Sequence, residues 1–238
     1  MEYQNVEKAI FLSRPNRFIA HVQLGEETLA VHVKNTGRCK ELLIPGVTVY
    51  LTKGNSDKRK TPYDLIAVEK MRPRQTPLLV NMDSQAPNQV AAEWIAKGNL
   101  FPPGSLIRRE VTIDNSRLDL AVTTNEETAY VEVKGCTLED QGVCRFPDAP
   151  TLRGVKHLNE LAALASKGIP SYLLMVVQMD EMKLFRPNEA THPEFAQALR
   201  NAVAAGVQLH VLTCAVTPNT LEINGQIPYC LDKEESFT

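Results

Sequence analysis

Three charged residues near the middle of the chain are of types that can carry out metal-assisted chemistry together. Glu132 and Lys134 stand two positions apart in the apolar, β-branched segment YVEVKG, and Asp119 stands in the preceding segment SRLDLAVTT. Side chains alternate between the two faces of a strand, so Glu132 and Lys134 share one face if their segment is a strand. If the two segments pair as a hairpin, Asp119 lies close to Glu132 on that face.

Two carboxylates held close together favour a bound cation. They repel each other and raise each other's pKa unless positive charge lies between them. Oxygen ligands suit Mg²⁺ or Mn²⁺ rather than zinc, and Lys134 would orient the attacking water or stabilise negative charge on a phosphoryl transition state. The alternative is a solvent-facing Glu-Lys pair, which half-exposed strands commonly carry. The short motif gains weight from the nearby aspartate and the apolar opposite faces.

The N-terminal third of the chain has the pattern of a small barrel. Residues 17–51 contain the alternating segments RFIAHVQL, ETLAVHVKN and GVTVYLTKG, separated by closely spaced Gly and Pro turn signals. We therefore predict an OB-like β-barrel domain over residues 1–84, an architecture that often binds oligonucleotides. The segments lack a clear set of alternating aromatics for stacking bases, so the pattern supports the barrel and does not identify its ligand.

Residues 85–238 have the pattern of an α/β domain with a mixed sheet. A helix is expected at about 88–97, with Ser84 or Asn88 as its cap and Gly98 at its end. Three strands follow in SLIRREVTID, SRLDLAVTT and TAYVEVKGCTL, and EDQGVCRFPDAP reads as a loop. The remaining elements are read as helix TLRGVKHLNELAALASKG, strand PSYLLMVVQ, helix PEFAQALRNAVAAG and strand VQLHVLT.

Composition limits the class of protein. The 238 residues, 43% of them hydrophobic, can fill the cores of two domains. A net charge of −2, from 26 basic and 28 acidic residues, argues against a protein that coats nucleic acid over its whole surface. No leader pattern is seen, and the longest apolar run, YLLMVV, is far shorter than the ~20 residues of a membrane span. We expect a cytoplasmic protein without a membrane partner, whose five cysteines are reduced thiols.

Two basic features are candidates for nucleic-acid contact. The first is a loop patch within KGNSDKRK that ends in Lys58, Arg59 and Lys60. The second is a polar stripe at helical spacing after the motif, formed by Arg153, Lys156, His157 and Glu160. Solvated charges are the ordinary explanation of either feature. The stripe, however, begins at a helix N-terminus next in order after the motif strand, where cations could contact phosphate.

Several blocks of the chain resemble the sugar fermentation stimulation protein A (SfsA) family. They are PNRFIAHV, HVKNTGRCKELLIPG, RKTPYDL, NSRLDL, YVEVKGCTL and, above all, FPDAPTLRGVKHLNEL. The resemblance runs from about Arg17 to about Leu212. It implies an OB-like domain followed by a restriction-endonuclease-like domain of the PD-(D/E)xK type, and it implies DNA as the partner.

The resemblance also implies roles for individual residues. The motif falls on Asp119, Glu132 and Lys134 as the catalytic set, with Asp119 and Glu132 as ligands of Mg²⁺ or Mn²⁺. Glu93 on the preceding helix and Glu110 on the first strand are acids at places where this fold often adds a ligand. The residues expected to contact nucleic acid are Lys58, Arg59, Lys60, Arg117, Arg153, Lys156 and His157.

Two functions remain open at this point. The first is a metal-dependent nuclease, which an intact Asp, Glu and Lys set favours because a pure binder gains little from burying like charges. The second is a DNA-binding regulator of sugar (maltose-type) metabolism genes that keeps the nuclease fold without cleaving, which the family's name favours. Fold alone does not decide between them. A pocket for a small phosphorylated metabolite has no supporting feature, and a two-fold homodimer is left open.

Overall fold

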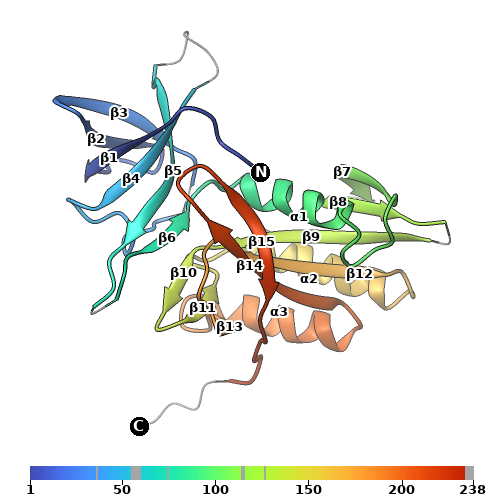
Figure 1. Cartoon of the computed structure of the whole chain (residues 1–238). Helices are drawn as coiled ribbons and strands as arrows, with labels where there is room; N and C mark the ends of the chain where they lie inside the picture. The colour runs from blue at the N-terminus through green and yellow to red at the C-terminus, as the bar shows by residue number, and fades with distance from the viewer. Residues whose placement is uncertain (36, 55–59, 74, 114–115, 126, 234–238) are drawn as a thin grey trace.

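The computed structural model describes residues 1–35, 37–54, 60–73, 75–113, 116–125 and 127–233. Two sheet-based units follow one another along the chain, the first drawn in blue to teal and the second in green to red (Figure 1). The domain boundary predicted at residue 84 falls between the last strand of the first unit and the first helix of the second. Among the described residues, no helix combines the length and the apolar character that crossing a membrane requires.

The first unit is a closed, OB-like barrel with one added strand. Its strands are β1 (Val6–Ser13), β2 (Ile19–Leu24), β3 (Glu27–Val33), β4 (Thr48–Lys53), β5 (Tyr63–Lys70) and β6 (Leu78–Asn81). They are ordered β3-β2-β1-β4-β5-β6, and a parallel pairing of β3 with β5 closes the barrel. Alternate residues such as Val22, Val31 and Val49 are fully buried, as the alternation in the sequence predicted.

The second unit is a mixed six-stranded sheet with helices on both faces. Its sheet contains β7 (Leu106–Ile113), β8 (Ser116–Thr123), β9 (Thr128–Cys136), β12 (Ser171–Val177), β14 (Gln208–Val216) and β15 (Leu221–Gln226). The order is β15-β14-β12-β9-β8-β7, with β9, β12 and β14 parallel. Helix α1 (Ala86–Ala96) packs on one face, and α2 (Leu152–Ala165) and α3 (Pro193–Ala204) lie on the other (Figure 1).

The structure differs from the sequence-based expectation at the edges of this unit. The segment read as a loop contains β10 (Leu138–Asp140) and β11 (Val143–Phe146), which form a small sheet with β13 (Leu184–Pro187). These strands have only three or four residues each, too few for an alternating pattern to be recognised. Helix α1 begins earlier than expected, so Asn88 lies inside the helix and is not its cap.

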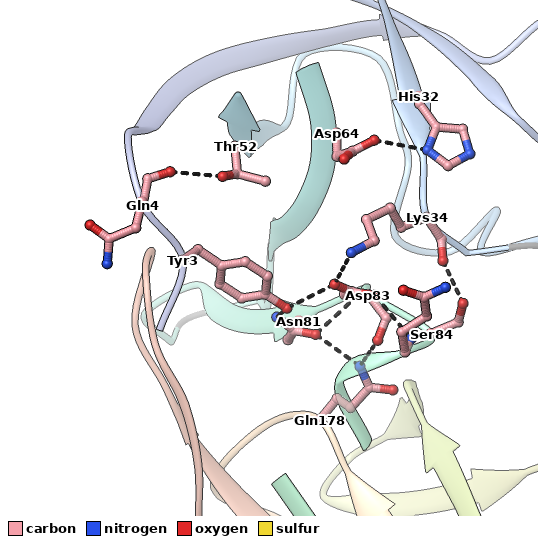
Figure 2. A network of polar contacts seen from close by, with 11 residues as sticks. Tyr3, Gln4, His32, Lys34, Thr52, Asp64, Asn81, Asp83, Ser84 and Gln178 are labelled. Atoms are coloured by element: carbon pink, nitrogen blue, oxygen red, sulfur yellow. Dashed lines mark hydrogen bonds and ion pairs between the residues drawn. The ribbon is translucent and has the colours of Figure 1, made fainter. Parts of the chain in front are cut away.

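A buried polar network joins the two units where β6 leads into α1. Gln178 Nε2 donates to Asn81 Oδ1 (2.9 Å) and to the carbonyl of Asp83 (3.0 Å) (Figure 2). The Asp83 carboxylate receives Lys34 Nζ at 2.5 Å and the Tyr3 hydroxyl at 3.2 Å. Because Asn81, Asp83 and Gln178 are each only 1% exposed and each has partners, the network fixes how the barrel meets the second unit.

Candidate active site

Asp119 lies where the pairing of β8 with β9 ends. The last paired residues are Leu120 and Val131, so Asp119 stands one step further on, opposite Glu132. Asp119 Oδ2 accepts a hydrogen bond from the backbone N–H of Val133 (2.9 Å), and Oδ1 accepts one from Asn88 Nδ2 (2.8 Å). A strand and the first turns of α1 therefore orient this carboxylate together.

Glu132 is buried on the face of the sheet that α2 covers, with 1% of its surface exposed. Val131 and Val133 pack with α1, whereas Glu132 faces α2, as the alternation of the strand predicted. Glu132 Oε1 accepts hydrogen bonds from Lys134 Nζ and from His157 Nδ1. Glu132 Oε2 is buried and has no hydrogen-bond partner among the described residues. A buried carboxylate oxygen without a partner is costly, so this atom is suited to a cation.

Helix α2 supplies the residue that holds Glu132. The helix begins after Thr151, whose Oγ1 accepts from the backbone N–H of Gly154 (3.0 Å) and caps the first turn. His157 Nε2 accepts from Arg153 Nε (3.3 Å), which assigns the ring proton to Nδ1, where it is donated to Glu132. His157 is only 6% exposed. In this structure it holds the carboxylate, and its expected contact with phosphate stays a prediction.

The two carboxyl groups differ in how readily they ionise. Burial, and then the charge of Glu132, raises the pKa of Asp119 above its ordinary value. Burial also raises the pKa of Glu132, but the hydrogen bonds from His157 and Lys134 outweigh it and leave that pKa below its ordinary value. A divalent cation between the two would favour the ionised form of Asp119. The pair thus fits a hard cation that keeps several waters and uses one or two carboxylates.

The other two expected ligands are used elsewhere. Glu93 Oε2 pairs with the amino group of Met1 (2.8 Å), and its Oε1 accepts from Gln89 Nε2 (2.9 Å). Glu110, at a positive φ of 55°, turns its exposed carboxylate to Arg117. Within the described part of the chain, no three His, Cys, Asp or Glu side chains are grouped to hold a metal. Glu93 and Glu110 are therefore paired elsewhere in this structure, and the assignment of metal ligands stays a prediction.

The cations expected to contact nucleic acid are dispersed. Those in the described ranges are all exposed, namely Lys60, Arg117, Arg153 and Lys156. Arg117 is paired with Glu110, and Lys156 Nζ lies 3.6 Å from Glu160 Oε1. Lys58 and Arg59 lie outside the described residues. Asn88 was missed as a site residue, because the only sequence signal at that position was a possible helix cap.

The role of His157 can be tested through stability in the absence of metal. His157→Leu should lower the free energy of unfolding by about 1–3 kcal/mol near neutral pH, because it removes a donor from a buried carboxylate. His157→Asn, whose amide can stand where Nδ1–H stands, is the matched control and should keep most of that stability. Urea unfolding in EDTA measures both variants, and equal losses would show that the bond to Glu132 does not matter.

The loss of stability in His157→Leu should depend on pH. The folded protein holds the pKa of Glu132 below its ordinary value. The stability that this carboxylate gains is therefore present above the ordinary Glu pKa and is lost as the pH falls through the lower, folded value. His157→Leu should differ most from the wild type near neutral pH and should approach it in acid. A difference that persists unchanged in acid would indicate lost packing rather than lost hydrogen bonding.

Comparison with known proteins finds matches over nearly the whole chain. Two family models match, the "SfsA N-terminal OB domain" over residues 12–76 and the "Sugar fermentation stimulation protein RE domain" over residues 85–220. The sugar fermentation stimulation protein homolog of Ruminiclostridium cellulolyticum is 48% identical over 227 residues, covering 95% of this chain and 98% of its own. That of Clostridium beijerinckii is 45% identical over 231 residues, covering 97% and 100%. The solved structure of Pyrococcus furiosus SfsA in complex with Ca²⁺ is 26% identical, with a TM-score of 0.83 and coverage of 96% and 97%.

Proposed function

The chain belongs to the sugar fermentation stimulation protein (SfsA) family, and from that premise we propose that it is a divalent-metal-dependent nuclease acting on DNA. The observation that carries the proposal is the pair of half-buried Asp119 and buried Glu132, in which Glu132 Oε2 has no partner among the described residues. A protein that only binds DNA gains nothing from placing Asp119 beside a buried carboxylate whose charge opposes the ionisation of Asp119. The relative from Pyrococcus furiosus, solved with Ca²⁺, supports a divalent cation.

Asp119 and Glu132 would hold Mg²⁺ or Mn²⁺. When bound, such an ion polarises a phosphoryl oxygen and lowers the pKa of water. The chain itself contributes orientation: Asn88 and the Val133 N–H fix Asp119, and His157 fixes Glu132. Lys134 Nζ, anchored on Glu132 and still 16% exposed, would donate a hydrogen bond to the attacking water or to a non-bridging phosphate oxygen.

A second candidate is the DNA-binding regulator that does not cleave. The observation that favours it is the state of the donor set: Lys134 is already paired with Glu132, and both Asp119 oxygens already accept hydrogen bonds. On this reading the charged cluster is a fold-stabilising network that retains the form of a nuclease site. The family's name, which refers to sugar fermentation, is in keeping with regulation.

Incubation of the purified protein with labelled linear, nicked and branched DNA tests the two candidates. Each DNA is offered with Mg²⁺, with Mn²⁺ and with EDTA, and both binding and cutting are followed. Cutting in either metal that stops in EDTA supports the nuclease. DNA that is retarded but intact in every metal overturns the nuclease and leaves the regulator.

Lys134→Met is the sharper variant for the catalytic step. It should lower the cleavage rate by about 10²–10³-fold, because it removes a positioned donor but leaves both carboxylates. Lys97→Met is the matched control, since Lys97 forms an exposed pair with Glu222 that contributes little. Single-turnover cleavage measures the chemical step, and a rate equal to the control's would remove Lys134 from the mechanism.

A further inference from the structure

A basic cavity of about 710 Å³ lies on the barrel beside the start of α2. The loop between β1 and β2, the connection from β3 to β4, and residues 149–150 before α2 form its walls. Its cations are Arg14, Arg17, Arg38 and Lys40, and the carboxylate of Asp148 lies beside the lining residue Gly37, so the cations outnumber the nearby acid. In a chain whose net charge is −2, this gathering of positive charge indicates an anionic ligand.

Arg14 is the residue that builds the cavity. Its guanidinium donates to four backbone carbonyls, those of Arg17, Asn35, Gly37 and Arg38, at 2.7 to 2.9 Å. These bonds tie the β1–β2 loop to the connection after β3, so the walls are preformed. Arg14 has no terminal N–H left for a ligand, and its role is structural.

The other three cations remain available. Arg17, Arg38 and Lys40 are exposed, and none of them forms an ion pair with a carboxylate in the described part of the chain. Three like charges around one cavity repel each other in the absence of a ligand. A phosphate group would relieve that repulsion and accept their hydrogen bonds.

The walls of the cavity are partly apolar, which suits a ligand larger than a phosphate group alone. Leu12, Leu43 and Pro45 line the cavity. Phe18, the residue after the lining residue Arg17, has 51% of its surface exposed, and the Arg17 guanidinium lies 5.9 Å from its ring centroid. Cations together with an exposed aromatic ring suit a nucleotide whose base has left the double helix, because stacking needs an unpaired face.

The cavity lies beside the start of α2, the helix that carries His157. Ala149 and Pro150 line it, and α2 begins at Leu152, which is 80% exposed. Arg153 and His157 follow in the first two turns, and His157 binds Glu132. At 1.5 Å per residue, Leu152 and His157 are separated by roughly 8 Å along the helix axis. A strand held in the cavity and running along the start of α2 would be directed toward the residue that binds Glu132.

We infer that this cavity binds a nucleotide of a single-stranded DNA segment, and that the same strand continues along the start of α2 to Asp119 and Glu132. The inference rests on the proposed function and specifies its substrate class, which is DNA with a single-stranded tail or flap rather than uniform duplex. The barrel recognises the unpaired strand, and the second unit holds the bond to be cut.

Binding of fluorescent oligonucleotides in EDTA tests the inference without any cleavage. The DNAs are a blunt duplex, the same duplex with a single-stranded tail, and the tail alone. The wild type should prefer the tailed DNA to the blunt duplex by about tenfold or more, and Arg17→Ala/Arg38→Ala/Lys40→Ala should lose that preference. The slope of log affinity against log salt for the tail should fall by about 2, from three lost contacts at ~0.7 each.

Two controls separate local from general effects. Lys167→Ala/Lys183→Ala/Lys233→Ala removes the same charge from exposed positions outside the cavity, and it should keep the preference for tailed DNA. Phe18→Ala should weaken binding of the tail by about 5- to 100-fold, and Phe18→Tyr should retain it. Loss of preference in both triple variants alike would point to net charge and overturn the inference.

The outcomes distinguish the inference from the proposed function. A cavity variant that binds tailed DNA with the affinity and salt slope of the wild type overturns the inference, even if the wild type cuts DNA in Mg²⁺. The wild type binding tails through the cavity without cutting in Mg²⁺ or Mn²⁺ supports the inference and overturns the nuclease. Equal affinity of the wild type for blunt and tailed DNA also overturns the inference.

Discussion

Asp119→Asn should lower Mg²⁺-dependent DNA cleavage by about 10³-fold or more, because half of the carboxylate charge that holds the cation is lost. The same variant should be at least as stable as the wild type in EDTA near neutral pH. Burial, and then the charge of Glu132, raises the pKa of Asp119 in the folded protein. A carboxyl group whose pKa is raised by folding contributes stability at pH values below its ordinary pKa. That contribution is lost as the pH rises through the pKa of the folded protein. The neutral amide avoids that cost, and its oxygen keeps the hydrogen bond from the Val133 N–H when the Asn88 amide turns to accept from the new Nδ2.

Three measurements check this result. Cleavage assays compare Asp119→Asn with Asp140→Asn, an exposed control on β10 that should cut at the wild-type rate. Thermal unfolding in EDTA should show the advantage of the Asp119→Asn variant near neutral pH and its loss in acid. Adding Mg²⁺ should raise the Tm of the wild type but not that of the variant, since a ligand stabilises only the state that binds it. Normal cleavage, or a clear loss of stability in EDTA, would contradict the assignment.

The local geometry of the carboxylate pair could be predicted from the sequence, because it depends on strand alternation alone. Alternation placed Glu132 and Lys134 on one face of β9, and the hairpin register places Asp119 opposite Glu132. The partners of these carboxylates could not be predicted in the same way. Asn88 and His157 come from helices on opposite faces of the sheet, and their contacts depend on how each helix packs.

The positions of the other two expected ligands, Glu93 and Glu110, also depend on features that the sequence does not indicate. Glu93 has the helical spacing to face the sheet, but its carboxylate is taken by the amino group of Met1, far away in sequence. Glu110 stands in register with Asp119 on the neighbouring strand. A positive φ at Glu110, which no sequence pattern indicated, turns its side chain to Arg117 instead.

The cavity on the barrel depends on contacts between segments that are distant in sequence. Residues 14–17, 37–40 and 149–150 carry no sequence signal that links them, and only the fold brings them together. Gly37 shows how close the approach is, since a Cβ there would lie 2.3 Å from Asp148 Oδ2. A larger residue at position 37 would force the side chains of Asp148 and Asn35 to move.

Gly135→Ala should destabilise the protein by about 1–3 kcal/mol and reduce cleavage, although Gly135 carries no functional group. A Cβ at this position would lie 2.4 Å from Gln178 Oε1 and 2.7 Å from Pro87 Cγ. Gln178 cannot turn away without breaking its bonds to Asn81 and Asp83 in the junction (Figure 2). The added methyl group must therefore displace β9 just after Lys134, or shift the first turn of α1.

A double-mutant cycle shows whether the junction transmits this displacement to the active site. Pro87 precedes Asn88, the donor to Asp119, so a shifted α1 would disturb that carboxylate as well as Lys134. Gln178→Ala removes one of the two obstacles, and Gly135→Ala/Gln178→Ala should lose less stability than the sum of the single variants. Urea unfolding and single-turnover cleavage measure the two effects. Strict additivity would show that the contact with Gln178 is relieved elsewhere, and that the junction does not position the catalytic residues.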